Sequence, residues 1–230
     1  MFPFSVSYEH KNILYQYCIA EWLPVIEQHR REINIRKGAA LFEEGSPVGG
    51  IYFIIKGKIK IHQRWTTEKE LILRFARDGD MVGHRGLARD KQYPITATAL
   101  EDSQLFYLPI DIFEATLKVN PQLTYALMDF YANELEATER RVRHMAHMNV
   151  KSRIAEALLG LRQLFGLTEE GFIDIRLTKQ ELAAYVGTTY ETISRMLANL
   201  EQEGLIRSDG KNLMLLKENN MMQLIEKQSS

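Results

Sequence analysis

The sequence predicts a mixed α+β chain, with an antiparallel β-barrel or jelly roll first, then one long helix, then a small helical domain that ends in a β-hairpin. Three observations lead to this prediction. Eight glycines from Gly38 to Gly86 separate short alternating apolar segments, residues 122–159 contain neither proline nor glycine, and two helix-start signals near the C-terminus lie ten residues apart. Glycine marks turns between strands, whereas its absence permits an uninterrupted helix.

The composition is that of an ordinary globular protein, since 45% of the 230 residues are hydrophobic and 26% are charged. The net charge of −1 gives no general attraction to polyanions, so nucleic-acid binding requires a local patch. Cys18, the single cysteine, cannot form an internal disulfide, a thiolate zinc site or an iron-sulfur cluster within one chain. The chain lacks both the roughly 18-residue apolar stretch of a membrane helix and a signal-peptide pattern. We therefore expect a cytoplasmic chain with no membrane partner.

The glycine-rich half, residues 1–118, is expected to form the sheet. Its apolar runs include IYFIIKGKIKIHQ and LILRFARDGDMVG. Gly57 separates residues 51–55 from 59–61 at hairpin spacing, and the ITATAL and SQLFYLP segments continue the pattern. Short strands of this kind close into a barrel or a jelly roll.

One long helix is expected over residues 119–147. Asn120 and Pro121 are typical of a helix start, as N-cap and first helical residue. An apolar seam follows at alternating steps of three and four residues, which keeps it on one face. Its residues are Met128, Tyr131, Leu135, Thr138, Val142 and Met145. The seam indicates either a partner helix or packing on the chain's own sheet, and its spacing leaves both open.

The stretch LTKQELAAYVGTTYETISRMLANLEQEGLI predicts a helix-turn-helix. Thr178 with Glu181 forms one capping box, and Thr188 with Glu191 forms a second, so two helix starts are specified. Gly187 is the turn residue between them. Ordinary helical hairpins carry such boxes too, so the exposed face of the second helix has to decide between the two interpretations.

That second helix, around 189–203, is polar near its start. The residues there are Thr189, Tyr190, Glu191, Ser194 and Arg195. An arginine can pair with guanine O6 and N7, a glutamate can accept from cytosine N4, and a serine suits either kind of edge. The plain alternative is a surface salt bridge between Glu191 and Arg195, worth about 0.3–0.5 kcal/mol.

Beyond this helix, Asp209-Gly210 lies between two apolar segments and predicts a hairpin. A helix-turn-helix followed by a hairpin is a winged helix, in which Lys211 at the tip, Arg207 and Lys179 can contact phosphates. The candidate DNA-binding residues are therefore Thr178, Lys179, Thr188, Thr189, Tyr190, Glu191, Ser194, Arg195 and Lys211.

In the order of its parts, nearly the whole chain resembles the Crp/Fnr superfamily of bacterial transcription regulators. The most specific portion is GTTYETISRMLANLEQEGLI, where Glu191, Ser194 and Arg195 match the E-x-x-S-R set of the fumarate and nitrate regulator branch. The resemblance implies three parts. They are a β-roll sensor domain (double-stranded β-helix or jelly roll) over residues 1–118, a dimerisation helix over 119–147 and a winged helix-turn-helix over 148–230.

The same resemblance implies a homodimer that binds two-fold symmetric DNA, with half-sites closer to TTGAC or TTGAT than to TGTGA. It favours the seam as the contact between the two copies, because palindromic DNA mirrors protein symmetry. It also implies RNA polymerase as a partner, and a signal at the β-roll whose identity the sequence does not give.

The sensor half departs from the cyclic-nucleotide-binding pattern at two positions. The GDMVG segment is followed by His84 where that pattern has Glu, and Tyr93-Pro94 stands where it has Arg. A cyclic phosphate needs a compensating positive charge, so cyclic AMP is not expected unless Arg85 or Arg89 substitutes. The N-terminal cysteine cluster of iron-sulfur members is absent as well.

Haem stays an alternative cofactor at this point, because histidine can ligate its iron. The candidate ligands are His10, His29, His62, His84, His144 and His147. Most single histidines are surface or hydrogen-bonded residues. His144 and His147 lie one helical turn apart but have no third ligand, so no metal site is predicted.

Two other classes of function compete with DNA binding. An adaptor module would show an apolar patch where the second helix has its polar face. An enzyme would show a phosphate-cradling loop, a nucleophile elbow, a zinc helix or paired carboxylates, and none of these motifs is found. We expect a sequence-specific DNA-binding regulator that is not an enzyme.

Overall fold

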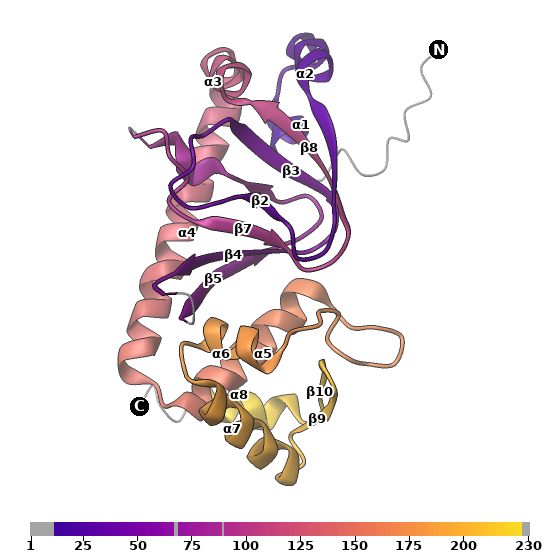
Figure 1. Ribbon diagram of the computed structural model, residues 1–230, viewed down its shortest axis with the longest axis vertical. Helices are drawn as coiled ribbons and strands as arrows, with labels where there is room; N and C mark the ends of the chain where they lie inside the picture. Colours follow the sequence, from indigo (N-terminus) through magenta and orange to yellow (C-terminus); the bar gives the residue numbers. More distant parts are fainter. Residues whose placement is uncertain (1–11, 67–68, 89, 227–230) are drawn as a thin grey trace. The chain divides into compact units, whose positions relative to one another are not determined.

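A computed structural model describes residues 12–66, 69–88 and 90–226. The chain divides into two compact units (Figure 1). The first contains residues up to 63 together with 73–134, and the second contains residues 64–72 and 135 onward.

Two four-stranded antiparallel sheets form the β-roll of the first unit. One sheet has the order β1 (Arg31–Ile35), β8 (Ser103–Pro109), β3 (Gly50–Lys56) and β6 (Met81–Val82). The other has the order β2 (Ala40–Phe42), β7 (Thr96–Ala99), β4 (Ile59–Arg64) and β5 (Glu70–Ala76). The strands expected around 51–55, 59–61, ITATAL and SQLFYLP are therefore all present.

The expected hairpin at Gly57 is wrong. β3 pairs with β8, with Phe53 opposite Phe106, whereas β4 pairs with β7, with Ile61 opposite Ala97. Gly57 thus connects two different sheets. Its φ of +134° suits glycine alone, and a Cβ there would meet Ser103 Oγ at 2.1 Å.

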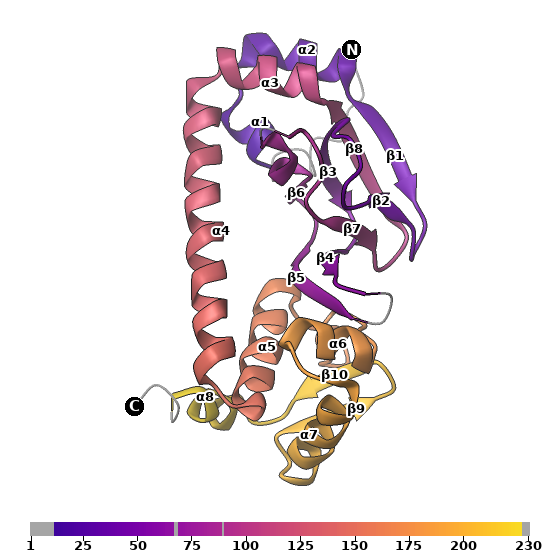
Figure 2. The ribbon, with the colours of Figure 1, turned by 60° about the vertical axis from the view of Figure 1, so that its left-hand side comes forward.

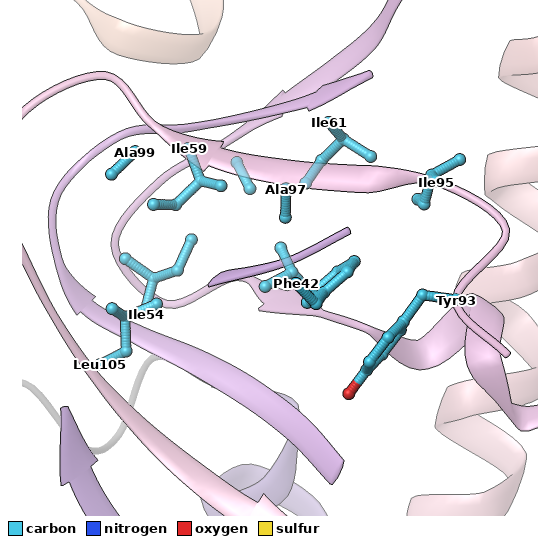
Figure 3. Close-up of a cluster of buried hydrophobic side chains, with 11 residues drawn as sticks. Phe42, Ile54, Ile59, Ile61, Tyr93, Ile95, Ala97, Ala99 and Leu105 are labelled. Carbon is cyan, nitrogen blue, oxygen red and sulfur yellow. The ribbon is translucent and has the colours of Figure 1, made fainter. Parts of the chain in front are cut away.

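Two apolar cores hold the first unit. One contains side chains from both sheets, including Ile54, Ile61 and Leu105 (Figure 3). The other joins the first sheet to helices through residues such as Phe53, Phe106 and Phe113. The helical segments are α1 (Ile13–Tyr17), η2 (Ala20–Trp22), α2 (Leu23–His29), η3 (His84–Leu87) and α3 (Ile110–Val119).

The long helix α4 (Pro121–His147) is uninterrupted, as the absence of glycine and proline predicts (Figure 2). Pro121 is its first residue, as expected. The Asn120 side chain does not cap it, however. That amide accepts from the Ile19 N–H at 2.7 Å and donates to the Thr116 carbonyl at 2.8 Å, so it fastens the end of α3 instead.

The second unit contains the remaining elements. They are α5 (Val150–Phe165), α6 (Lys179–Val186), α7 (Tyr190–Gln202), the hairpin strands β9 (Ile206–Asp209) and β10 (Asn212–Leu215), and α8 (Glu218–Glu226). Its buried residues include Ile154, Leu158, Leu182 and Ile193. Within the described ranges, no helix has the length and apolar character needed to cross a membrane.

Candidate nucleic-acid interface

The first helix of the motif, α6, begins with the expected capping box. Thr178 Oγ1 accepts from the Glu181 N–H at 3.1 Å, and Glu181 Oε2 accepts from the Thr178 N–H at 2.9 Å. Two orphan N–H groups are satisfied in this way. Thr178 and Lys179 therefore sit at a well-defined helix start.

The second expected capping box, Thr188 with Glu191, is wrong. The N–H groups of Gly187 and Thr188 both donate to the Ala183 carbonyl, at 2.9 and 3.0 Å, so Thr188 still belongs to the end of α6. Gly187 takes the left-handed conformation, with φ +75°. The N-cap of α7 is Thr189, which accepts from the Thr192 N–H at 3.3 Å.

The inner and outer faces of α7 differ in the way the sequence predicts. Ile193, Leu197 and Leu200 are buried. Thr189, Tyr190, Glu191 and Arg195 are exposed, and Ser194 is half-buried. The polar side chains expected to read bases are thus gathered on the outward face near the start of one helix.

The hairpin completes the winged helix. β9 pairs with β10 from Asp209 opposite Asn212 to Ile206 opposite Leu215, and Gly210 at the turn has φ +59°. Lys211 lies exposed beside this turn. The hairpin is tied to α7, because Glu201 accepts from the N–H and the hydroxyl of Ser208 at 2.8 and 2.9 Å.

The last turns of α4 are fastened to this motif. The Arg141 guanidinium donates to the Tyr185 carbonyl at 2.6 Å. The Arg153 guanidinium donates to the carbonyls of Met148 and Gly187, at 3.0 and 3.2 Å. A Cβ on Gly187 would meet the Met145 methyl at 2.8 Å. These contacts join α4, α5 and the turn before α7.

The seam residues of α4 fall into two groups. Met128, Leu135 and Val142 step by seven residues and are 63, 60 and 61% exposed, and Thr138 is also exposed. Tyr131 instead lies half-buried in the β-roll unit, where its hydroxyl donates to the His84 carbonyl at 2.5 Å. Met145 is half-buried beside Gly187.

Tyr93, which stands where the cyclic-nucleotide-binding pattern has Arg, lies in the apolar interior of the β-roll. Tyr93 is 3% exposed, and its ring stacks on Phe42 with centroids 4.0 Å apart (Figure 3). Its hydroxyl donates to the Gly50 carbonyl at 2.7 Å. Tyr93 therefore contributes an aromatic wall and no positive charge.

Arg85, considered as a substitute for the missing charge, takes part in a cluster around Glu134 of α4. The Glu134 carboxylate contacts Arg74 Nε at 2.8 Å, His84 Nε2 at 3.1 Å and Arg85 Nη2 at 3.3 Å. No pattern in the sequence predicted this cluster. Arg89, the other substitute considered, lies outside the described residues.

Opposing effects set the ionisation of this cluster. Burial raises the pKa of Glu134, but the hydrogen bond from His84 and the charges of Arg74 and Arg85 outweigh it and bring that pKa to about 2. Burial lowers the pKa of His84, against the hydrogen bond to Glu134, which raises it. The carboxylate is therefore ionised and the imidazole is held toward its neutral form.

The histidines weighed as haem ligands are engaged in protein contacts or lie at the surface. His62 Nε2 is 2.8 Å from Thr98 Oγ1, and His29 Nδ1 is 2.8 Å from the Val25 carbonyl. His144 pairs with Glu156 at 2.7 Å, while His147 is exposed. His10 lies outside the described residues. Among those described, no three His, Cys, Asp or Glu residues are placed to hold a metal ion.

Comparison with known sequences matches both halves of this arrangement. Residues 32–120 match the cyclic nucleotide-binding domain family, and residues 152–224 match the Crp-like helix-turn-helix domain family. The Anaerobic regulatory protein of Pasteurella multocida is 31% identical over 198 residues, which are 85% of this chain and 71% of that protein. The chain belongs to the CRP/FNR family of transcription regulators.

Other CRP/FNR proteins agree in sequence and in fold. The cAMP-activated global transcriptional regulator CRP of Salmonella typhimurium is 30% identical over 200 residues, 84% of this chain and 94% of that protein. A CRP/FNR-family regulator from Thermus thermophilus is 27% identical, with a TM-score of 0.73, over 86% of this chain and all of that one (100%). FixK2 from Bradyrhizobium japonicum, 21% identical with a TM-score of 0.75 over 85% of this chain and 96% of that one, shares the fold.

Membership of the CRP/FNR family confirms the predicted fold class and the resemblance to transcription regulators. It makes the chain a transcription regulator with a helix-turn-helix DNA-binding domain, in a family whose members typically bind palindromic sites as homodimers.

Proposed function

We propose that this regulator binds palindromic promoter DNA as a homodimer and reads each half-site with the outward face of α7. The polar face of α7 carries this proposal, because Tyr190, Glu191 and Arg195 are exposed together at the start of a helix whose other side is buried. A recognition helix enters the major groove with these first residues. Thr178 and Thr189 cap the two helices and Thr188 precedes the second, while Lys179 begins α6 and Lys211 lies exposed at the hairpin turn.

The homodimer contact that we propose is the exposed row on α4. Met128, Leu135 and Val142 recur every seven residues, which is the period of paired helices. Tyr131 and Met145 would support this row from within each chain, and Thr138 would lie at its edge. Two recognition helices about 34 Å apart can enter successive major grooves.

The remaining parts of the proposal concern control. The three-part division assigns sensing to residues 1–118, dimerisation to 119–147 and DNA binding to 148–230. The partner protein at the promoter would be RNA polymerase. A signal at the β-roll would act by favouring one arrangement of the dimer over another. The single cysteine, Cys18, favours the reducing environment of the cytoplasm. The absence of catalytic motifs from the sequence favours a non-enzymatic role.

Arg195→Ala tests the role of α7. We expect the binding free energy for duplexes with inverted TTGAT or TTGAC half-sites to weaken by about 1–3 kcal/mol, roughly 5- to 150-fold in affinity. The preference for guanine over other bases at one half-site position should weaken as well. Fluorescence anisotropy at fixed salt measures this. Arg162→Ala removes the same charge from α5, where Arg162 pairs with Glu218, and should leave base choice unchanged. Equal binding of wild type and Arg195→Ala to every duplex would refute the assignment.

A further inference from the structure

Lys179 stands at the first position of α6, but its side chain is directed toward α7. Its ammonium donates a hydrogen bond to Ser194 Oγ at 3.0 Å, across fifteen residues of sequence. Ser194 belongs to the polar set near the start of α7. A residue expected to bind a phosphate is therefore in contact with a residue expected to read a base.

The surroundings of Lys179 include a second charged residue, Glu201. A small cavity of about 70 Å³ lies between the start of α6, α7 and the hairpin, and its lining includes Lys179, Ser194, Glu201, Ser208 and Lys211. The N–H and hydroxyl of Ser208 lower the pKa of Glu201, and the nearby charge of Lys179 adds to this effect. The lysine thus lies near a carboxylate and donates its hydrogen bond to the Ser194 hydroxyl.

The hydrogen bond to Ser194 reduces the value of Lys179 as a phosphate contact. Counterion release from DNA depends on how many phosphates a protein neutralises, and the Lys179 ammonium already has Ser194 Oγ as its acceptor. Lys211 differs, because within the part of the chain that the structure describes it has no hydrogen bond or ion pair. Lys211 is the stronger candidate for the phosphate contact.

The hydrogen bond from Lys179 also changes what Ser194 can recognise. A serine hydroxyl offers one donor and two acceptor lone pairs, so it normally suits either kind of base edge. When an ammonium donates to that oxygen, a lone pair is occupied and the O–H becomes a better donor. Guanine, adenine and thymine present acceptors in the major groove, whereas cytosine presents its N4 donor.

We propose that Lys179 is a positioning residue that fixes Ser194 as a hydrogen-bond donor and so excludes cytosine from one position of each half-site. This rests on the proposed role of α7 as the base-reading helix.

A double-mutant cycle tests the coupling. Wild type, Lys179→Met, Ser194→Ala and the double variant are titrated against duplexes in which each half-site position carries all four bases in turn. We expect wild type to disfavour cytosine at one position by on the order of tenfold. Either single variant should reduce this preference to roughly twofold, and the double variant should reduce it no further. Lys179→Arg keeps a donor to Ser194 and should restore the preference.

The salt dependence of binding separates positioning from phosphate contact. For Lys211→Met, the slope of log affinity against log salt should shrink by about 0.9 while base preferences persist. For Lys179→Met, the slope should stay near that of wild type. If Lys179→Met instead weakens binding to all duplexes equally and flattens the slope as Lys211→Met does, Lys179 is a phosphate contact and the proposal fails. A wild-type chain that binds no duplex would refute the proposed function itself.

Discussion

Glu134 shows how one side chain joins parts of the first unit that are distant in sequence. It lies on α4, and its three partners lie on β5 and η3. Burying a carboxylate is costly unless it is paired, and here two guanidinium groups and an imidazole supply the pairing. Phe130 and Tyr131 pack against the same imidazole ring. The segment after the GDMVG turn is therefore attached to α4 by charged and aromatic contacts.

Glu134→Gln should lower the free energy of unfolding by about 3 kcal/mol near neutral pH, because two half-buried guanidinium groups lose their counter-charge. The folded-state pKa of Glu134, about 2, lies below the ordinary value. Its stabilisation is therefore fully present above about pH 5 and is lost as pH falls toward 2.

Urea unfolding of both proteins across this pH range measures the effect. The difference between them should shrink as pH drops. Glu136→Gln, an exposed neighbour on the same helix, is the control and should change little. A difference that stays constant between pH 7 and pH 3 would contradict the assigned ionisation.

The roles of single residues were only partly predictable from sequence. The exposed positions of Glu191 and Arg195 follow from helical periodicity, which is a local property. Glu134 carries no such signal, because its partners on β5 and η3 are distant in sequence and only the fold brings them together. The contact between Lys179 and Ser194 is also invisible to periodicity, since it depends on how α6 crosses α7.

At the scale of elements, the turn between α6 and α7 depends on Gly187. With φ +75° and the Met145 methyl 2.8 Å from where a Cβ would stand, this position opposes any side chain. Gly187→Ala should therefore lower the free energy of unfolding by about 1–2 kcal/mol. Gly160→Ala is the matched control: Gly160 lies within α5, a Cβ there would meet nothing within 4 Å, and alanine should raise stability by about 0.5–1 kcal/mol.

Thermal or urea unfolding of the two glycine variants decides this prediction. Opposite shifts in the midpoint are expected. If Gly187→Ala were as stable as wild type, the turn would not require the left-handed conformation.

The elements that depend on local chemistry were predicted best. The cap of α6, the turn glycine and the Asp209-Gly210 hairpin are each specified by a few neighbouring residues. The second cap was misplaced by one residue because Thr188 and Thr189 are both good N-caps, and only the bond from the Thr188 N–H to Ala183 distinguishes them. The partner of β3 was missed because sheet pairing is decided by core packing between distant strands.

At the scale of the whole molecule, the exposed row on α4 should control assembly. Leu135→Glu places a charge in the proposed contact between copies and should raise the dimer dissociation constant roughly thirtyfold or more, since a central apolar residue contributes about 2 kcal/mol. The fold of each copy should persist, because Leu135 is 60% exposed. Sedimentation velocity over a range of concentrations measures the dimer fraction.

Ala137→Glu is the control for this charge. Ala137 is exposed, and it lies on the opposite face of α4 because two residues advance a helix by about 200°. It should leave the dimer intact. Equal effects of the two variants, or no effect of Leu135→Glu, would exclude this face as the contact.

The contacts of Arg141, Met145 and Arg153 have a mechanical consequence. They fasten the last turns of α4 to the carbonyls of Tyr185 and Gly187, which lie shortly before α7 begins at Tyr190. If this part of α4 rotates about its own axis, we expect α6 and the start of α7 to rotate with it, because these hydrogen bonds connect them directly. Rotation of the end of α4 would thus move the side chains of α7 that we propose to read bases, and removal of the Arg141 and Arg153 guanidinium groups would weaken this connection.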